Sequence, residues 1–207
     1  MTGMQPDYRI LPPAGWHFLT PIYDPVCSVL GFGKSCKRWV LGFADVAPNH
    51  RVLDLGCGTG TLVELLLAGY PSVQVHGVDP DRGALRIARR KAARHQNARV
   101  SFHPARAEEL PFPEATFDRV ICSLAFHHIP DQHKGAALHE VHRTLRADGM
   151  FLLADFETTR GVFFWGRRSR QSLEDWLSEA GFHTTYCGHR RGVHVLEARS
   201  AETRMPG

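Results

Sequence analysis

The sequence has no long apolar run and no cysteine framework. None of its apolar stretches reaches the roughly 18 residues of a membrane-spanning helix, so we expect no transmembrane segment. The N-terminus lacks a basic start followed by an apolar run, which argues against a secretory signal. The five cysteines are scattered without a C-x-x-C pair. This pattern indicates reduced thiols in a cytoplasmic protein and argues against a disulfide frame or a zinc knuckle.

A strong excess of charge is also missing. The 25 lysines and arginines exceed the 21 acidic residues by only +4, which does not indicate a nucleic-acid partner. Thirteen histidines are present, and His139 and His142 lie three positions apart on an expected helix. No cysteine or carboxylate completes a recognisable ligand set around them. We therefore expect neither nucleic-acid binding nor a metal site.

Short apolar runs alternate with helical stretches over most of the chain. The expected strands are 51–55, 73–79, 99–103, 117–122, 150–156, 183–189 and 193–199, and the expected helices are 61–68, 81–95, 131–145 and 172–180. This alternation predicts an α/β, Rossmann-like, doubly wound sheet of seven strands with helices on both faces. Residues 187–193 leave room for a hairpin but not for a crossover helix. The sheet should therefore be mostly parallel, with one antiparallel strand near the C-terminus.

The length of 207 residues fits one domain with small additions. We divide it into an N-terminal helical cap or lid at 1–47, a ligand-binding domain at 48–200 and a C-terminal tail at 201–207. Aromatic residues are frequent in 14–47 and in 157–171, and both segments could cap a ligand cleft. Arginines follow the aromatics of the second segment, which leaves peripheral membrane contact open.

A glycine-rich turn is the strongest signal in the chain. Gly56, Gly58 and Gly60 alternate between a buried strand and a helix. Glycine permits a positive φ and a close approach of the backbone to a ligand, and a helix start offers free N–H groups. In an open α/β sheet such a turn lies at the carboxyl ends of the strands, where ligands bind. The sequence therefore predicts a ligand site here.

The residues around the turn distinguish between a dinucleotide and a nucleoside with a charged amino-acid tail. Dinucleotide sites usually read G-x-G-x-x-G, whereas the spacing here is G-x-G-x-G. Asp54, two positions before the first glycine, would repel a pyrophosphate but suits an ammonium group. Asp79 ends the second strand, 23 positions after Gly56, and can accept both hydroxyls of a ribose. These features favour S-adenosylmethionine (SAM) over NAD, and a ligand-free structural loop is the remaining alternative.

With these features, the sequence resembles the class I SAM-dependent methyltransferases. It is most similar to the small-molecule branch with a type 11 methyltransferase domain, which includes the ubiquinone/menaquinone C-methyltransferases. The resemblance extends from about residue 20 to 199. It is carried by segments 52–60, 77–80, 107–113, 123–129 and 145–150, in the family's order.

The resemblance implies roles for individual residues. The cofactor-binding residues that it implies are Asp54, Gly56, Cys57, Gly58, Gly60, Asp79, Pro80, Ala107, Glu108 and Ser123. The glycine turn would surround the methionine portion, with Cys57 as a small space-filling residue. Asp79 would hold the ribose, and Pro80, Ala107 and Glu108 would flank the adenine. Many relatives have an acidic residue where this chain has Arg106, so the adenine amine lacks that acceptor here, and Glu108 or a backbone carbonyl could substitute for it.

Methyl transfer from SAM needs mainly positioning, and a general base where the acceptor must lose a proton. His127 and His128 follow the fourth strand, at the expected active face, and we favour His128 as that base. Both residues have packing or helix capping as an alternative role. Tyr23 matches an N-terminal aromatic that closes over the cofactor in similar proteins and is a weaker catalytic candidate.

The sequence thus predicts a methyltransferase (EC 2.1.1.-) that uses SAM and acts on a small-molecule, apolar acceptor. The segment 157–171 is shorter than the corresponding insertion in quinone-modifying relatives, which favours a smaller or more open acceptor site. Two alternatives stay open. One is an RNA methyltransferase, although no base-flipping motif or added RNA-binding domain is present. The other is a SAM-binding protein without catalytic activity.

Overall fold

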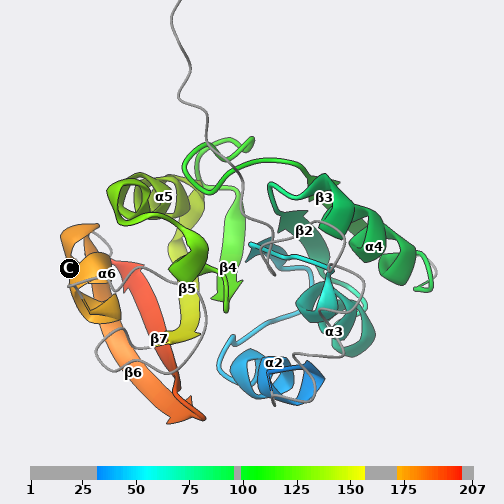
Figure 1. Ribbon diagram of the computed structural model, residues 1–207, viewed down its shortest axis with the longest axis horizontal. Coiled ribbons are helices and arrows are strands. Elements are labelled where there is room, and N and C mark those ends of the chain that lie inside the picture. Colours follow the sequence, from blue (N-terminus) through cyan, green and yellow to red (C-terminus); the bar gives the residue numbers. More distant parts are fainter. Residues whose placement is uncertain (1–31, 96–98, 157–171, 202–207) are drawn as a thin grey trace, which may run out of the picture.

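The computed structural model describes residues 32–95, 99–156 and 172–201. Its centre is a sheet of seven strands in the order β3-β2-β1-β4-β5-β7-β6 (Figure 1). The strands are β1 Arg51–Leu55, β2 Gln74–Val78, β3 Arg99–His103, β4 Phe117–Ser123, β5 Leu145–Phe156, β6 Phe182–Arg190 and β7 Val193–Ser200. The helices are α2 Lys34–Leu41, α3 Thr61–Gly69, α4 Arg82–Ala92, α5 Asp131–Thr144 and α6 Leu173–Glu179, with a 3₁₀ turn, η2, at Phe126–His128.

The strand directions confirm the predicted sheet. β1 is parallel to β2 and β4, and the parallel part extends to β3 on one side and β5 on the other. β7 enters between β5 and β6 and is antiparallel to both. The two residues between β6 and β7 are Arg191 and Gly192, and both have a positive φ, as a tight hairpin requires.

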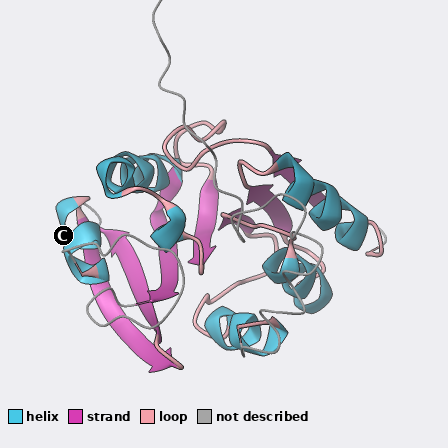
Figure 2. Ribbon diagram, viewed as in Figure 1, coloured by secondary structure: helices cyan, strands magenta, loops and turns pink. Residues whose placement is uncertain are grey.

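Helices cover both faces of the sheet (Figure 2). Helices α2, α3 and α4 pack on one face, where Val52 and Ile121 point, and α5 and α6 pack on the other, where Leu53 and Val120 point. Neighbouring residues of one strand therefore belong to opposite cores, as the two-residue period of a strand dictates. Both faces are apolar, which explains why the central strands read as continuous apolar runs.

The predicted boundary between the fourth helix and the fifth strand is wrong. β5 begins at Leu145, directly after α5, and Leu145 pairs with Phe117. The register then jumps, because Met150 pairs with Arg119. Residues 146–149, which include the turn-forming pair Asp148-Gly149, form an irregularity within the strand. Asp148-Gly149 is a local turn signal, but the pairing of β5 with β4 resumes after it, at Met150.

Two helix ends match the sequence signals. Asp81 caps α4, since its side chain accepts the Gly83 N–H at 2.6 Å. Gly181 follows α6 with φ of +83°, the left-handed conformation in which helices commonly end. In the three described ranges, no helix is long and apolar enough to cross a membrane.

Candidate functional site

The candidate site lies where β1 and β4 stand side by side in the sheet. From β1 the chain proceeds to β2 and β3 on one side, and from β4 it proceeds to β5 on the other. The two strands therefore send their following loops in opposite directions at their carboxyl ends. Such a switch point leaves a crevice in open α/β sheets and is the usual place for a ligand. Both the glycine turn and η2 begin there.

The glycine turn connects β1 to α3 and needs glycine at each of the three predicted positions. Gly56, Gly58 and Gly60 have φ values of +72°, +52° and +78°. A Cβ on Gly60 would lie 2.8 Å from the Cβ of Ala88, so this glycine also allows α3 and α4 to approach closely. Among the described residues, a Cβ on Gly58 would meet nothing within 4 Å. Gly58 is therefore required by its backbone conformation and has open space beside it.

The Asp79 carboxylate ties the glycine turn to the end of β2. One of its oxygens accepts the Gly58 N–H at 2.8 Å, and the other accepts the Asp81 N–H at 2.8 Å. Burial raises the pKa of Asp79, while these two hydrogen bonds act in the opposite direction. Each carboxylate oxygen can accept more than one hydrogen bond, so acceptor capacity remains for hydroxyl groups.

Two buried polar atoms at the carboxyl ends of β1 and β4 lack a hydrogen-bond partner among the described residues. They are Oδ2 of Asp54 and Oγ of Ser123, in residues that are 2% and 3% exposed. A buried polar atom without a partner costs about 1–3 kcal/mol, so such atoms call for an explanation. Their position beside the glycine turn is explained if a polar ligand group binds against them.

Asp54 has an unusual electrostatic environment. Burial raises its pKa to about 7, and the negative charge of Asp79 adds to this effect. Lys37 on α2 acts against it, because its ammonium group lies near the same strand ends and donates to the Ser123 carbonyl at 3.3 Å. A ligand cation next to Asp54 would stabilise its ionised form further.

His127 and Asp155 form a tightly bonded pair at the carboxyl ends of β4 and β5. Nδ1 of His127 lies 2.7 Å from Oδ1 of Asp155, and the His127 backbone N–H donates to Oδ2 at 3.0 Å. Burial acts to raise the pKa of Asp155, but the His127 ring and the backbone donors lower it below its usual value. The His127 side chain is 24% exposed, whereas that of Asp155 is fully buried.

His128, the base favoured from the sequence, lies next to this pair. Its ring centroid is 4.0 Å from that of His127. Crowding by protein atoms lowers the pKa of His128 to about 4, with His127 adding to the effect, even though the residue as a whole remains exposed to solvent. His128 is therefore neutral near pH 7, but the buried carboxylate that could orient a base belongs to His127.

The comparisons with known proteins agree with this geometry. A methyltransferase-domain family model matches residues 52–149. The chain is 31% identical over 150 residues to a ubiquinone/menaquinone biosynthesis C-methyltransferase of Geotalea daltonii, covering 70% of this chain and 63% of that protein. It is 36% identical over 141 residues to a demethylmenaquinone methyltransferase of Thermus thermophilus, covering 67% and 62%.

Residues 52–149 match a methyltransferase domain, and the chain is similar to the class I SAM-dependent methyltransferases.

A solved structure of a relative shows the same architecture. The crystal structure of YcgJ from Bacillus subtilis superposes with a TM-score of 0.62 at 27% identity, covering 74% of this chain and 70% of that one. The chain spans only 63% and 62% of the two curated relatives above. Their activities are therefore properties of longer proteins.

The residues of the site fit SAM, the cofactor of this methyltransferase family. The orphaned Asp54 oxygen and the Ser123 hydroxyl can accept from an ammonium group, and the open space at Gly58 admits a ligand against the backbone. Asp79 keeps acceptor capacity for a ribose. Cys57 is buried with its Sγ against Gly77, where an added Cβ would lie 2.9 Å away, in keeping with a space-filling role.

The other predicted residues are placed as follows. Pro80 is exposed directly after Asp79, which leaves its ring available to a flat ligand. Ala107 packs against the core beneath α5, and Glu108 lies 3.9 Å from His133 and 4.0 Å from Arg106. Tyr23 and the segment 157–171 lie outside the described residues, so their predicted roles stay predictions.

Sequence reasoning missed two residues of the site. Asp155 is the single acid in the apolar run of β5, and this isolation was the signal that could have identified it. Lys37 was not among the predicted site residues. Among the described residues, no cluster of three or more histidines, cysteines and acids could hold a metal ion.

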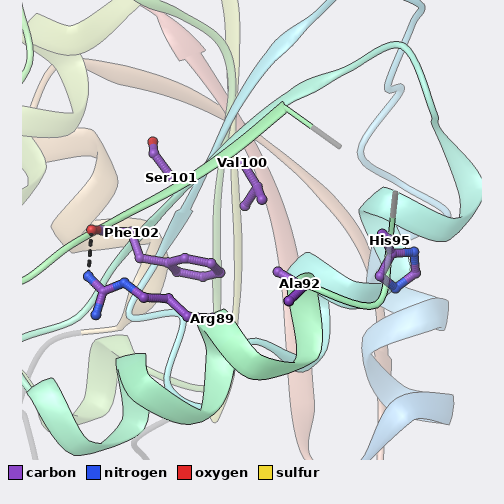
Figure 3. Close-up of a pocket in the computed structure, with 7 residues that line it drawn as sticks. Arg89, Ala92, His95, Val100, Ser101 and Phe102 are labelled. Carbon is purple, nitrogen blue, oxygen red and sulfur yellow. Dashed lines mark hydrogen bonds between the residues drawn. The ribbon is translucent and has the colours of Figure 1, made fainter. Parts of the chain in front are cut away.

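A separate hollow lies between α4 and β3 (Figure 3). It is lined by the last turns of α4 and by β3, and Arg89 crosses it to donate to the Phe102 carbonyl at 3.0 Å. None of the predicted site residues lines it. It is a surface feature of the sheet edge, apart from the cofactor site.

Proposed function

We propose that this chain transfers the methyl group of SAM to a small-molecule acceptor. The observation that carries the proposal is the pair of unpartnered buried atoms, Oδ2 of Asp54 and Oγ of Ser123, beside the glycine turn. The Gly58 N–H is already held by Asp79, so the turn is arranged for a ligand before one binds. This is the arrangement expected of a site that fixes a nucleoside with a cationic amino-acid tail.

We further propose an apolar, aromatic acceptor. The curated relatives carry names that refer to quinone biosynthesis, which supports this class. Two phenylalanines also support it, one against the His127 ring and the second against the first. Phe156 packs edge-on against His127 at 5.6 Å between ring centroids, and Phe32 packs edge-on against Phe156 at 5.2 Å. Both phenylalanines are partly buried, so they offer apolar surface next to the site.

The chemistry requires little from the protein beyond placement. SAM supplies a methyl group on a positively charged sulfur, which is already a good leaving group. The residues of this chain bind the nucleoside, exclude water and hold the acceptor in line. Such positioning can lower a barrier by up to about 7–11 kcal/mol.

Calorimetry tests the cofactor part of the proposal. We expect binding of SAM and S-adenosylhomocysteine but not of NAD. Asp79→Ala should weaken SAM binding by about 1–3 kcal/mol, because the ribose acceptors are lost. Asp118→Asn is the matched control, since Asp118 starts β4 at the opposite end of the strand and bonds Arg51 there. Equal effects of the two variants would contradict the assignment.

Transfer itself is tested with methyl-labelled SAM and a protein-free extract of cell metabolites, with total RNA in a parallel reaction. We expect label in an organic-soluble small molecule. Label in RNA would favour the RNA methyltransferase alternative. SAM binding without any label transfer would favour the inactive SAM-binding alternative and overturn the proposed activity.

A further inference from the structure

We propose that His127, oriented by Asp155, is the general base that removes a proton from the methyl acceptor, so that the acceptor belongs to the nucleophiles that carry an ionisable proton. This inference rests on the proposed function and specifies its substrate class. Phenols, thiols, N–H groups and acidic C–H groups belong to this class. Tertiary amines and thioethers do not.

The hydrogen bonds of the pair fix the tautomer of the ring. The Asp155 carboxylate is ionised and therefore only accepts hydrogen bonds. Its contact of 2.7 Å with Nδ1 of His127 requires the proton to be on Nδ1. A neutral His127 ring then has its lone pair on Nε2. This is the orientation by a buried carboxylate that prepares a histidine to take a proton.

Three donors hold the carboxylate in place. Besides the two groups of His127, the Phe156 N–H donates to Oδ1 of Asp155 at 2.7 Å. Asp155 is fully buried, so a charge there would be costly without these donors. The main chain on both sides of the contact is therefore part of the pair, and the position of the His127 ring relative to β5 is fixed.

The pair is connected to the cofactor site through the loop after β4. Ala125, two residues before His127, lies against Gly56, where an added Cβ would come within 2.3 Å of the Ala125 Cβ. Ser123, four residues before His127, carries one of the unpartnered atoms of the site. The loop that carries Ser123 and His127 thus packs directly on the glycine turn. The partial exposure of His127 leaves room for contact with a second ligand.

The proposed step couples a proton transfer to His127 with the methyl transfer. The acceptor proton moves to Nε2 of His127, and the electron pair left on the acceptor forms the new bond to the methyl carbon. The electron pair of the broken carbon–sulfur bond stays on sulfur, and the imidazolium then releases its proton to water. Asp155 keeps its charge throughout and stabilises the imidazolium, so it is a positioning residue.

The first test needs neither acceptor nor cofactor. Nitrogen-15 NMR of the histidine rings in the cofactor-free protein should show His127 with a protonated Nδ1 and an unprotonated Nε2 at slightly alkaline pH. His127 is assigned by the disappearance of its signals in His127→Asn. A ring protonated on Nε2 would overturn the proposal, whatever the activity of the protein.

The second test uses His127→Asn in the label-transfer reaction described above. The asparagine amide can still donate to Asp155 in place of Nδ1 but has no equivalent of Nε2. We expect unchanged SAM binding and transfer lowered roughly 10²–10⁴-fold. His142→Asn is the matched control, because His142 on α5 bonds Ser200 at the end of β7 at 3.0 Å, and its replacement should leave transfer unchanged.

The outcomes separate the two proposals. No label transfer by the unaltered protein would overturn the proposed function and, with it, the role of His127. Transfer by the unaltered protein that His127→Asn retains would overturn the role of His127 alone. Label found on a tertiary amine or a thioether would do the same, as would a loss of transfer in His128→Asn with none in His127→Asn.

A pH profile distinguishes a positioning role of Asp155 from a purely structural one. The described titratable groups that face the His127 ring are Asp155 on β5 and His128 on the same turn. Asp155→Asn should shift the acidic limb of the rate profile to lower pH, because the imidazolium loses its carboxylate. A lower rate with an unshifted profile would contradict the positioning role.

Discussion

Gly56 and Ala125 pack so closely that a methyl group on Gly56 would lie 2.3 Å from the Cβ of Ala125. The first loop of the site thereby rests directly on the loop after β4. We expect Gly56→Ala to lower stability by about 1–3 kcal/mol, because it adds both a clash and a strained positive φ. Thermal unfolding and SAM calorimetry would measure the effect.

Two further variants separate the two causes. Gly69→Ala, at the end of α3 where an added Cβ meets no described atom within 4 Å, should be nearly neutral. Combining Gly56→Ala with Ala125→Gly removes the clash but keeps the strain at φ +72°, so it should restore part of the stability. No restoration would mean that the contact with Ala125 is unimportant.

Asp54 should lower the stability of the cofactor-free protein at alkaline pH. Its pKa is about 7 in the folded chain against 3.8 ordinarily, so between these values the unfolded chain loses a proton that the folded chain keeps. Stability therefore falls as the pH rises through this range and stays low above it. Asp54→Asn should raise Tm at pH 8 but not at pH 4, while it weakens SAM binding.

Asp118→Asn should change stability in the opposite direction from Asp54→Asn. Although burial acts to raise it, the pKa of Asp118 is lowered by the Arg51 N–H and Arg146, so ionised Asp118 stabilises the fold. Its replacement should lower Tm at neutral pH and leave SAM binding intact. If Asp54→Asn also lowered Tm at pH 8, the buried carboxylate would have to be stabilised by a partner other than the cofactor.

Arg119 should support the cofactor site from a distance. Its guanidinium donates to the carbonyls of Ala44 and Asp118 at 3.0 and 2.8 Å and pairs with the Asp45 carboxylate at 2.9 Å. These bonds attach the segment after α2 to β4. Lysine lacks the planar set of five donors, so Arg119→Lys should lower Tm by several degrees.

The same change should also weaken SAM binding, because α2 carries Lys37 next to Asp54. Arg199→Lys is the control, since Arg199 forms an exposed pair with Glu197 at 2.6 Å. Exposed pairs contribute about 0–1 kcal/mol, so this variant should unfold almost as the unaltered protein does. An equally small effect of Arg119→Lys would remove its supporting role.

His76 should make the protein sensitive to mild acid. Burial, together with the positive charges of Arg51 and His103, lowers its pKa to about 4. The unfolded chain takes up a proton near pH 6.5 that the folded chain refuses until about pH 4, so stability is lost as the pH falls through this window. The slope should approach roughly 1.4 kcal/mol per pH unit.

His76→Asn should reduce this slope while costing some stability at neutral pH. The asparagine can keep a bond to Ser101, whose hydroxyl lies 2.9 Å from the His76 ring. Tm measured from pH 7 to pH 5 gives the result. An unchanged acid slope in the variant would assign the sensitivity to other groups.

The architecture could be predicted from the sequence because each central strand has a recognisable pattern within a short run of adjacent residues. The run Arg51–Leu55 and the hairpin before Val193 carry their signals in a few adjacent residues. The start of β5 could not be found in this way, since Leu145 becomes part of the strand only by pairing with Phe117.

The site residues also differ in whether a local sequence pattern could predict them. Its glycines and acids lie in short motifs, so the sequence could predict them. The contact of Lys37 with Ser123 joins residues 86 positions apart, and that of His127 with Asp155 joins residues 28 positions apart. Neither spacing has a local signature. The choice between His127 and His128 depends on which ring meets the carboxylate, and only the packing of η2 on β5 decides this.

The two hydrogen bonds of Asp79 have a consequence for the thermodynamics of ligand capture. One carboxylate sets the distance between the first loop of the site and the start of α4 during folding itself. The backbone entropy of ordering these loops is therefore lost when the chain folds and not when the nucleoside arrives. Association should then proceed with little rearrangement of the main chain around the ribose, and its heat should come mainly from contacts newly made.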